Sequence, residues 1–94
     1  MEFTWDEDKR LSNLAKHALD FEDAHWVFTV EAFVAEDIRR DYGEHRFTLY
    51  GPLFNRIVVA VFTQRDGVIR ILSMRKANQR EQRSYYQKRS EAAR

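Results

Sequence analysis

The hydrophobic and polar positions divide the chain into a helical first third and a strand-rich remainder. Asp6 is a good N-cap residue, and the apolar residues that follow it recur at helical spacing as far as about His17. One face of this helix holds Leu11, Leu14, Ala15 and Ala18. The pattern predicts that this apolar face packs on the core. Asp20 predicts the start of a second short helix that ends near Thr29.

From residue 31 onward the pattern changes to strands. Runs rich in β-branched and aromatic residues, separated by turn residues, cover residues 31–38, 46–50, 57–65 and 68–75. They predict an antiparallel four-stranded meander, to which the weakly alternating residues 2–5 could add a short extra strand. Helix propensity over residues 77–91 predicts a basic C-terminal helix. Only Ala77, Tyr85 and Tyr86 are available to dock it, so the end of the chain is expected to be loosely held.

The length fits one hydrophobic core, so we expect one α+β domain over residues 1–94. Its best-defined feature is the Asp66-Gly67 pair between the last two strands, which predicts a two-residue hairpin. The expected pairs include Arg65 with Val68, Thr63 with Arg70, Ala60 with Ser73 and Val58 with Arg75. This register places Arg70 and Arg75 on opposite faces of the sheet. It predicts two separate arginine clusters, each a candidate phosphate clamp or, alternatively, an ordinary strand-end arginine with an acidic partner.

The net charge of +1 conceals a strong asymmetry along the chain. Residues 1–47 carry six Lys/Arg and twelve Asp/Glu, a charge of −6, whereas residues 48–94 carry ten and three, a charge of +7. A basic half of this kind can attract polyanions even when the total charge is close to zero. The alternative is an ordinary solvated surface. The basic residues after residue 75 alternate with glutamine and tyrosine, a combination that suits phosphate contacts and base stacking but also a solvated helix docked by its tyrosines.

Several kinds of chemistry are disfavoured. The chain has no cysteine, its three histidines lack metal-ligand spacing, and its three glycines are isolated, so we expect no metal site, no nucleotide-binding loop and no cofactor. No apolar run is long enough to span a membrane, and residues 1–10 are too acidic for a signal peptide. These features predict a cytoplasmic protein without a membrane partner.

The residues also match a family pattern over nearly the whole chain. The opening W-D-x-x-K-x-x-x-N-x-x-K-H of residues 5–17, the following DFEDA, and R-I-x-S-x-R-x-A-x-x-x-E-x-R-x-Y of residues 70–85 resemble BrnT toxins of bacterial type II toxin–antitoxin systems. Arg46 and Thr63 also fit the resemblance. It implies a RelE-like fold and an endoribonuclease that cleaves RNA without metal and arrests growth. It also implies a BrnA-like ribbon-helix-helix antitoxin, with operator DNA bound only through the toxin–antitoxin complex.

Metal-free RNA cleavage needs a base for the attacking 2′-OH, an acid for the leaving 5′-oxygen, and cations for the phosphorane. Arg46 and Arg75 suit the cationic role, and His17 is the matched residue whose ordinary pKa lies near neutrality. Glu81 or Tyr85 could take the proton-transfer role instead, and His17 could simply pair with an acid such as Asp20.

The candidate catalytic residues are therefore His17, Arg46, Arg75 and Glu81. The candidate RNA contacts are Lys16, Arg65, Arg70, Ser73, Lys76, Arg80, Arg83 and Tyr85. An endoribonuclease toxin is the preferred hypothesis. The alternative, from a different functional class, is a nucleic-acid-binding or partner-binding subunit without turnover.

Overall fold

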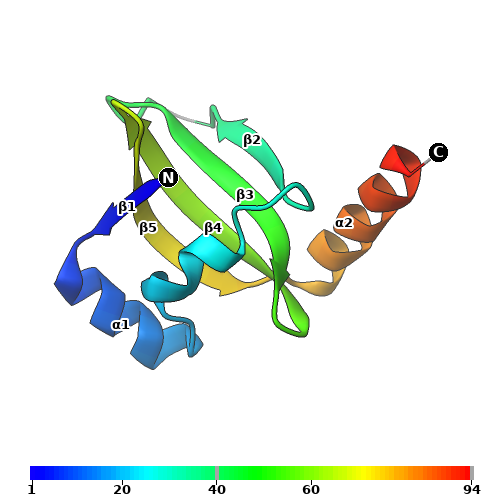
Figure 1. The fold of residues 1–94 in the computed structure, drawn as a ribbon, viewed down its shortest axis with the longest axis horizontal. Helices are drawn as coiled ribbons and strands as arrows, with labels where there is room; N and C mark the ends of the chain where they lie inside the picture. Colours follow the sequence, from blue (N-terminus) through cyan, green and yellow to red (C-terminus); the bar gives the residue numbers. More distant parts are fainter. Residues whose placement is uncertain (40, 94) are drawn as a thin grey trace.

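The computed structural model describes residues 1–39 and 41–93, which form one five-stranded sheet with helices on both of its faces (Figure 1). In chain order the elements are β1 (Glu2–Trp5), α1 (Glu7–His17), the 3₁₀ helix η1 (Phe21–Trp26), β2 (Phe33–Asp37), β3 (Arg46–Leu53), β4 (Arg56–Arg65), β5 (Val68–Lys76) and α2 (Gln79–Ala92). In these residues neither α-helix has the length and apolar character needed to cross a membrane.

The strand order is β1-β5-β4-β3-β2. Strands β2 to β5 form the predicted antiparallel meander, and β1 pairs with β5 in parallel. The α+β class and the C-terminal helix are confirmed. Residues 2–5, which could add a short extra strand, form β1, so the sheet has five strands and is mixed instead of purely antiparallel.

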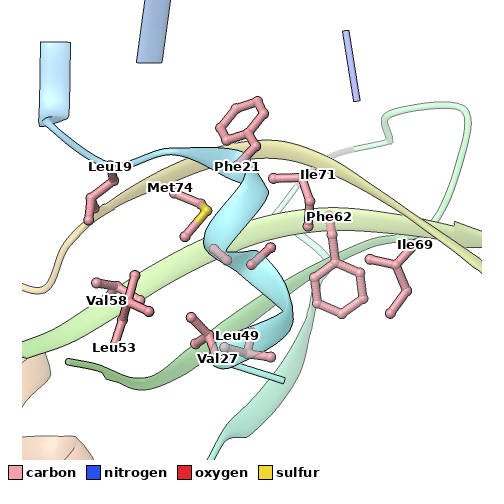
Figure 2. Packing of buried hydrophobic residues seen from close by; sticks show 12 residues of the cluster. Leu19, Phe21, Val27, Leu49, Leu53, Val58, Phe62, Ile69, Ile71 and Met74 are labelled. Atoms are coloured by element: carbon pink, nitrogen blue, oxygen red, sulfur yellow. The ribbon is translucent and has the colours of Figure 1, made fainter. Parts of the chain in front are cut away.

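One face of the sheet, here called the core face, carries the main hydrophobic core (Figure 2). Phe62 of β4 and Ile71 of β5 are paired across the strands and are both buried on this face. The segment around η1 crosses this face and buries Phe21 and Val27 against it. The second short helix begins after Asp20 as predicted, although it is a 3₁₀ helix and ends at Trp26, earlier than expected.

The opposite face, here called the open face, is covered by α2 at one end. Tyr85 of α2 is buried there with Val59 of β4, beside Phe33 and Tyr50. Asn78 caps the helix in a capping box: its side chain accepts a hydrogen bond from the Glu81 amide, and the Glu81 carboxylate accepts one from the Asn78 amide. The cap and the docked tyrosine hold α2, which runs as one continuous helix as far as Ala92.

The β4–β5 hairpin follows the predicted register only near its turn. Thr63 pairs with Arg70 and Phe62 with Ile71, but the register shifts at the next pair, where Val61 faces Ser73. Leu72 is the extra residue of a β-bulge. The predicted pairs beyond this point are wrong by one residue, and Arg75 lies opposite Val59 instead of Val58.

Helix α1 is oriented differently from the prediction. Its buried residue is Asn13, whereas Leu11 and Leu14 are 51% and 37% exposed. The Asn13 amide donates to the carbonyl of Met74 at 2.9 Å and accepts from the Met74 amide at 3.2 Å. Strand β1 ends opposite Ile71, so Asn13 takes over hydrogen bonds that a continuing strand would have made with β5. These backbone bonds, which a hydropathy pattern does not contain, turn the polar side of α1 inward.

Candidate nucleic-acid interface

The bulge at Leu72 places the arginines of β5 on one face of the sheet. In the observed register Arg70 pairs with Thr63 and Arg75 with Val59, and both partners belong to the same alternating set of β4. Arg46 of β3 pairs with Thr63 from the other side. The expectation that Arg70 and Arg75 form separate sites on opposite faces is therefore wrong. All three arginines lie on the open face.

The three arginines flank a row of small residues. Arg46, Thr63 and Arg70 form one row across β3, β4 and β5, so the two arginine Cα atoms are about 10 Å apart at the usual strand spacing. The next row on this face consists of Ala35, Thr48, Val61 and Ser73. Arg75 stands on the far side of that row, opposite Val59. We call the row of Ala35, Thr48, Val61 and Ser73 the floor. Its side chains are shorter than the arginines, which stand on two sides of it.

Arg75 is fixed by Glu81 in the first turn of α2. Its two terminal nitrogens each donate to one Glu81 carboxylate oxygen at 2.8 Å, a bidentate ion pair. The hydrogen bonds from Arg75 hold the pKa of Glu81 below its usual value, and the same bonds raise the pKa of Arg75. The Arg75 side chain is still 43% exposed, so its other N–H groups can reach a ligand. Glu81 orients Arg75 and stays ionised at neutral pH.

Arg46 is held by an aromatic ring instead of a carboxylate. Its guanidinium carbon lies 4.2 Å from the centre of the Tyr42 ring. The Tyr42 hydroxyl donates to Asp37 at 3.0 Å, and Arg39 forms an ion pair with the same carboxylate at 2.9 Å. Hydrogen bonds from Arg39 depress the pKa of Asp37 strongly. The buried Nε of Arg46 has no hydrogen-bond partner within the described part of the chain, so one donor at the floor is unused.

Two hollows extend the floor. One, of about 540 Å³, runs between β2 and Arg75 over Ala35, Thr48 and Val61. The other, of about 280 Å³, lies between β2 and α2 and shares Ala35 and Glu81 with it. The second hollow has an apolar base of Phe33 and Tyr50 and a basic rim of Arg80 and Lys88. Phosphate-binding and ring-stacking groups thus adjoin the same floor.

The remaining predicted contacts are distributed over the surface. Arg65 lies with Arg70 and Thr63 in a third hollow at the turn end of the hairpin. Lys76 ends β5 opposite Val58, a core-face residue, and is exposed there. Arg83, one turn after Arg80 on α2, lines a different hollow from Arg80, together with Tyr86. These positions bring Arg65 to the open face but leave Lys76 and Arg83 away from the floor.

Tyr85 occupies a structural position. Its side chain is buried, its hydroxyl donates to the Glu31 carbonyl at 2.7 Å, and its ring packs edge-on against Phe33. Burial raises the pKa of the Tyr85 hydroxyl. A ring enclosed in this way stacks on protein side chains, which favours docking of α2 over contact with RNA.

His17 and Lys16 lie in the last turn of α1. His17 is half-buried one turn beyond Asn13 on the same helix face, and so towards the end of β5. Within the described residues its ring has no hydrogen-bond or ion-pair partner. The alternative in which His17 pairs with Asp20 is not found in the described residues, where Arg10 pairs with the Asp20 carboxylate at 3.0 Å.

Sequence reasoning did not identify Tyr42 and Asp37 as parts of the site. Asp37 is the cross-strand partner of Arg46 in β2 and β3. The β2–β3 connection contains no short turn motif that would have set this register. The described residues contain no group of three or more His, Cys, Asp or Glu placed to hold a metal ion.

Comparison with protein families provides one match. Residues 5–81 match the family described as ribonuclease toxin, BrnT, of type II toxin-antitoxin system. The match begins in β1, covers the whole sheet and ends at Glu81 in the first turn of α2. A search of curated proteins finds no match to this chain.

Proposed function

The chain belongs to the BrnT family of ribonuclease toxins of type II toxin–antitoxin systems, and from this premise we propose that its open face is a metal-independent endoribonuclease site. The observation that carries the proposal is the placement of Arg46, Arg70 and Arg75 around one floor of small residues. A phosphodiester of single-stranded RNA can approach the sheet closely at such a floor while arginines contact its oxygens from both sides.

In the proposed reaction the 2′-oxygen attacks the adjacent phosphorus and the bond to the 5′-oxygen breaks, which leaves a 2′,3′-cyclic phosphate. One proton leaves the 2′-OH and one is delivered to the 5′-oxygen. The pentacovalent phosphorane carries more negative charge than the substrate, so cations aimed at its oxygens lower the barrier. We assign this role to Arg75, oriented by Glu81, and to Arg46, oriented by Tyr42.

Proton transfer needs a group that is neither buried nor occupied. Tyr85 donates to a backbone carbonyl, and Glu81 accepts two hydrogen bonds from Arg75. The ring of His17 is not engaged in this way, and His17 lies on the helix that contacts β5. We therefore propose His17 as the proton-transfer residue. Its contribution would appear as a change in the pH profile of kcat for His17→Gln.

As a toxin of this kind, the chain would arrest growth in the cytoplasm and be neutralised by a BrnA-like ribbon-helix-helix antitoxin. Operator DNA would be contacted through the toxin–antitoxin complex. These proposals follow from the family, which implies a protein antitoxin.

The experiment that tests the proposal is cleavage of labelled RNA by the purified chain in excess chelator. We expect products ending in a 2′,3′-cyclic phosphate, with Arg75→Ala slower by about 10²- to 10³-fold, as for loss of one transition-state donor. Arg56→Ala is the matched control, because Arg56 is exposed at the β3–β4 turn and belongs to the alternating set of β4 that faces away from the floor. RNA binding without products at any enzyme concentration would replace this proposal with a non-catalytic binding subunit, and activity lost in chelator would overturn metal independence.

A further inference from the structure

Helix α1 presents its apolar side to solvent. Leu11 and Leu14 are exposed, and Ala15 and Ala18 on the same side are exposed as well. Figure 1 shows α1 at the margin of the molecule, with its outer side free of other elements of the fold. We call the surface formed by Leu11, Leu14, Ala15 and Ala18 the outer α1 face. Four apolar residues in one helical stripe are typical of a helix face that packs on another surface.

The orientation of the helix is fixed from inside, so this face cannot rotate into the core. Asn13 makes three hydrogen bonds, two with the backbone of Met74 and one to the carbonyl of Leu19 at 3.1 Å. On the same inner side Arg10 forms an ion pair with Asp20 at 3.0 Å. If the helix turned so that Leu11 and Leu14 faced inward, these backbone groups would be buried without hydrogen-bond partners. The free energy lost in this way would exceed the free energy gained by burying the two leucine side chains. The exposure of Leu11 and Leu14 therefore follows from the hydrogen bonds and the ion pair that set the orientation of α1.

The charge next to the outer α1 face is negative. Glu7 and Asp8 form the first turn of the helix, and Glu22 and Asp23 begin the neighbouring η1. Glu7 lies within the apolar stripe by helical spacing, and Asp8 borders it. Helix α1 also carries three basic residues, but Arg10 is paired with Glu7 and Asp20, and by helical spacing Lys9 and Lys16 lie on the side opposite Leu11. A partner that covers this face therefore gains from positive charge beside its apolar residues.

We propose that the outer α1 face is the docking surface for the antitoxin, which would contact it with an amphipathic helix that carries basic residues. The partner's identity rests on the proposed function, whereas the surface itself rests on Leu11, Leu14 and the acidic turn. The surface shares no residue with the floor that contains Arg46, Arg70 and Arg75. Attachment of the antitoxin and cleavage of RNA therefore depend on different side chains, and one can be removed without the other.

The test is calorimetric titration of the purified antitoxin into three forms of the chain: the wild type, Leu11→Ser/Leu14→Ser, and Asp8→Lys. We expect the double variant to bind at least about 100-fold more weakly, since two anchoring leucines are lost. Asp8→Lys should bind about 5- to 10-fold more weakly, with a smaller dependence on salt. Val30→Ser is the matched control, because Val30 is 97% exposed outside α1 and away from the floor, and it should bind as the wild type does.

RNA cleavage by the double variant is measured in the same samples and should equal that of the wild type but resist neutralisation. This readout separates the two ideas, because a wild type without nuclease activity would overturn the proposed function and leave the binding result intact. Wild-type affinity in a double variant with an unchanged melting temperature would overturn the docking surface. A wild-type chain that dimerises through these leucines without antitoxin would also overturn it, in favour of a second copy as the occupant.

Discussion

The two faces of the sheet use alternate residues of the same strands for different purposes. On the core face Phe62 is buried and its ring packs against Phe28 and Phe47. On the open face its neighbour Val61 is part of a half-exposed floor between arginines. The core face is closed by the η1 segment, and the open face is covered at one end by α2. Because successive side chains of a strand point to opposite faces of the sheet, one hairpin can contribute to a stable core and to a charged binding surface.

The largest expected effect is on stability, and it should differ between substitutions on the core face and on the open face of the sheet. Phe62→Ala should lower the free energy of unfolding by about 3–5 kcal/mol, because it leaves a cavity in the core. Val61→Ala, one residue away on the open face, should cost about 1 kcal/mol or less. Urea unfolding followed by tryptophan fluorescence measures both values. Equal losses would mean that the two faces do not differ in their contribution to the core.

A smaller effect should appear in activity alone. Glu81→Gln keeps an amide acceptor at the third position of α2, which preserves the capping box, but it removes the charge that holds Arg75. We expect kcat for RNA cleavage to fall about 10-fold while the melting temperature changes by about 2 °C or less. A variant with full activity would show that Arg75 does not depend on Glu81 for its orientation.

The bulge explains why sequence reasoning recovered the fold better than the site. The Asp66-Gly67 turn and the alternation of β4 predict the register correctly as far as Ile71. Beyond it, a regular hairpin and a bulged one have the same composition, and one extra residue exchanges the faces of everything that follows. The residues of the site could therefore be predicted individually, while their meeting on one face could not.

Helix α1 was also predicted correctly as an element, but the side of it that faces the core was not. Its apolar spacing correctly predicts a helix from Asp6 to His17, because the cap and the periodicity are local. Which side faces inward depends on the backbone of β5, which ends its pairing with β1 at Ile71 and needs the Asn13 amide next. Hydropathy alone places the leucines inside, and the hydrogen bonds of a distant strand place them outside.

A third prediction tests the bulge directly. Deletion of Leu72 leaves Ile71 opposite Phe62 and Ser73 opposite Val61, so Arg75 keeps its place on the open face. We expect a loss of about 1–2 kcal/mol in unfolding free energy from the missing half-buried leucine, with RNA cleavage within about 5-fold of the wild type. A folded but inactive deletion variant would show that the local twist of the bulge, beyond the register, is needed for the site.

The smallest expected effect lies beside the end of β2, where His45 in the β2–β3 connection contacts Glu36 at 2.6 Å. The hydrogen bond that the His45 ring donates to the Glu36 carboxylate raises the pKa of His45 above its ordinary value. A raised pKa in the folded state means that the folded chain holds this proton more tightly than the unfolded chain does. The contribution to stability is therefore fully present below the ordinary histidine pKa and is lost as the pH rises through the raised value.

Because both side chains are largely exposed, water and salt screen the interaction, and its effect on stability should be small. NMR titration of the His45 ring should give a pKa above about 6.5 in the wild type and a lower one in Glu36→Gln. His25 lies in η1, away from this pair, and unchanged ring resonances of His25 between the two proteins would show that the substitution leaves the rest of the fold intact. If the His45 pKa is the same in both proteins, the β2–β3 connection is not joined to β2 by this pair, and the network around Tyr42 and Asp37 must hold Arg46 without it.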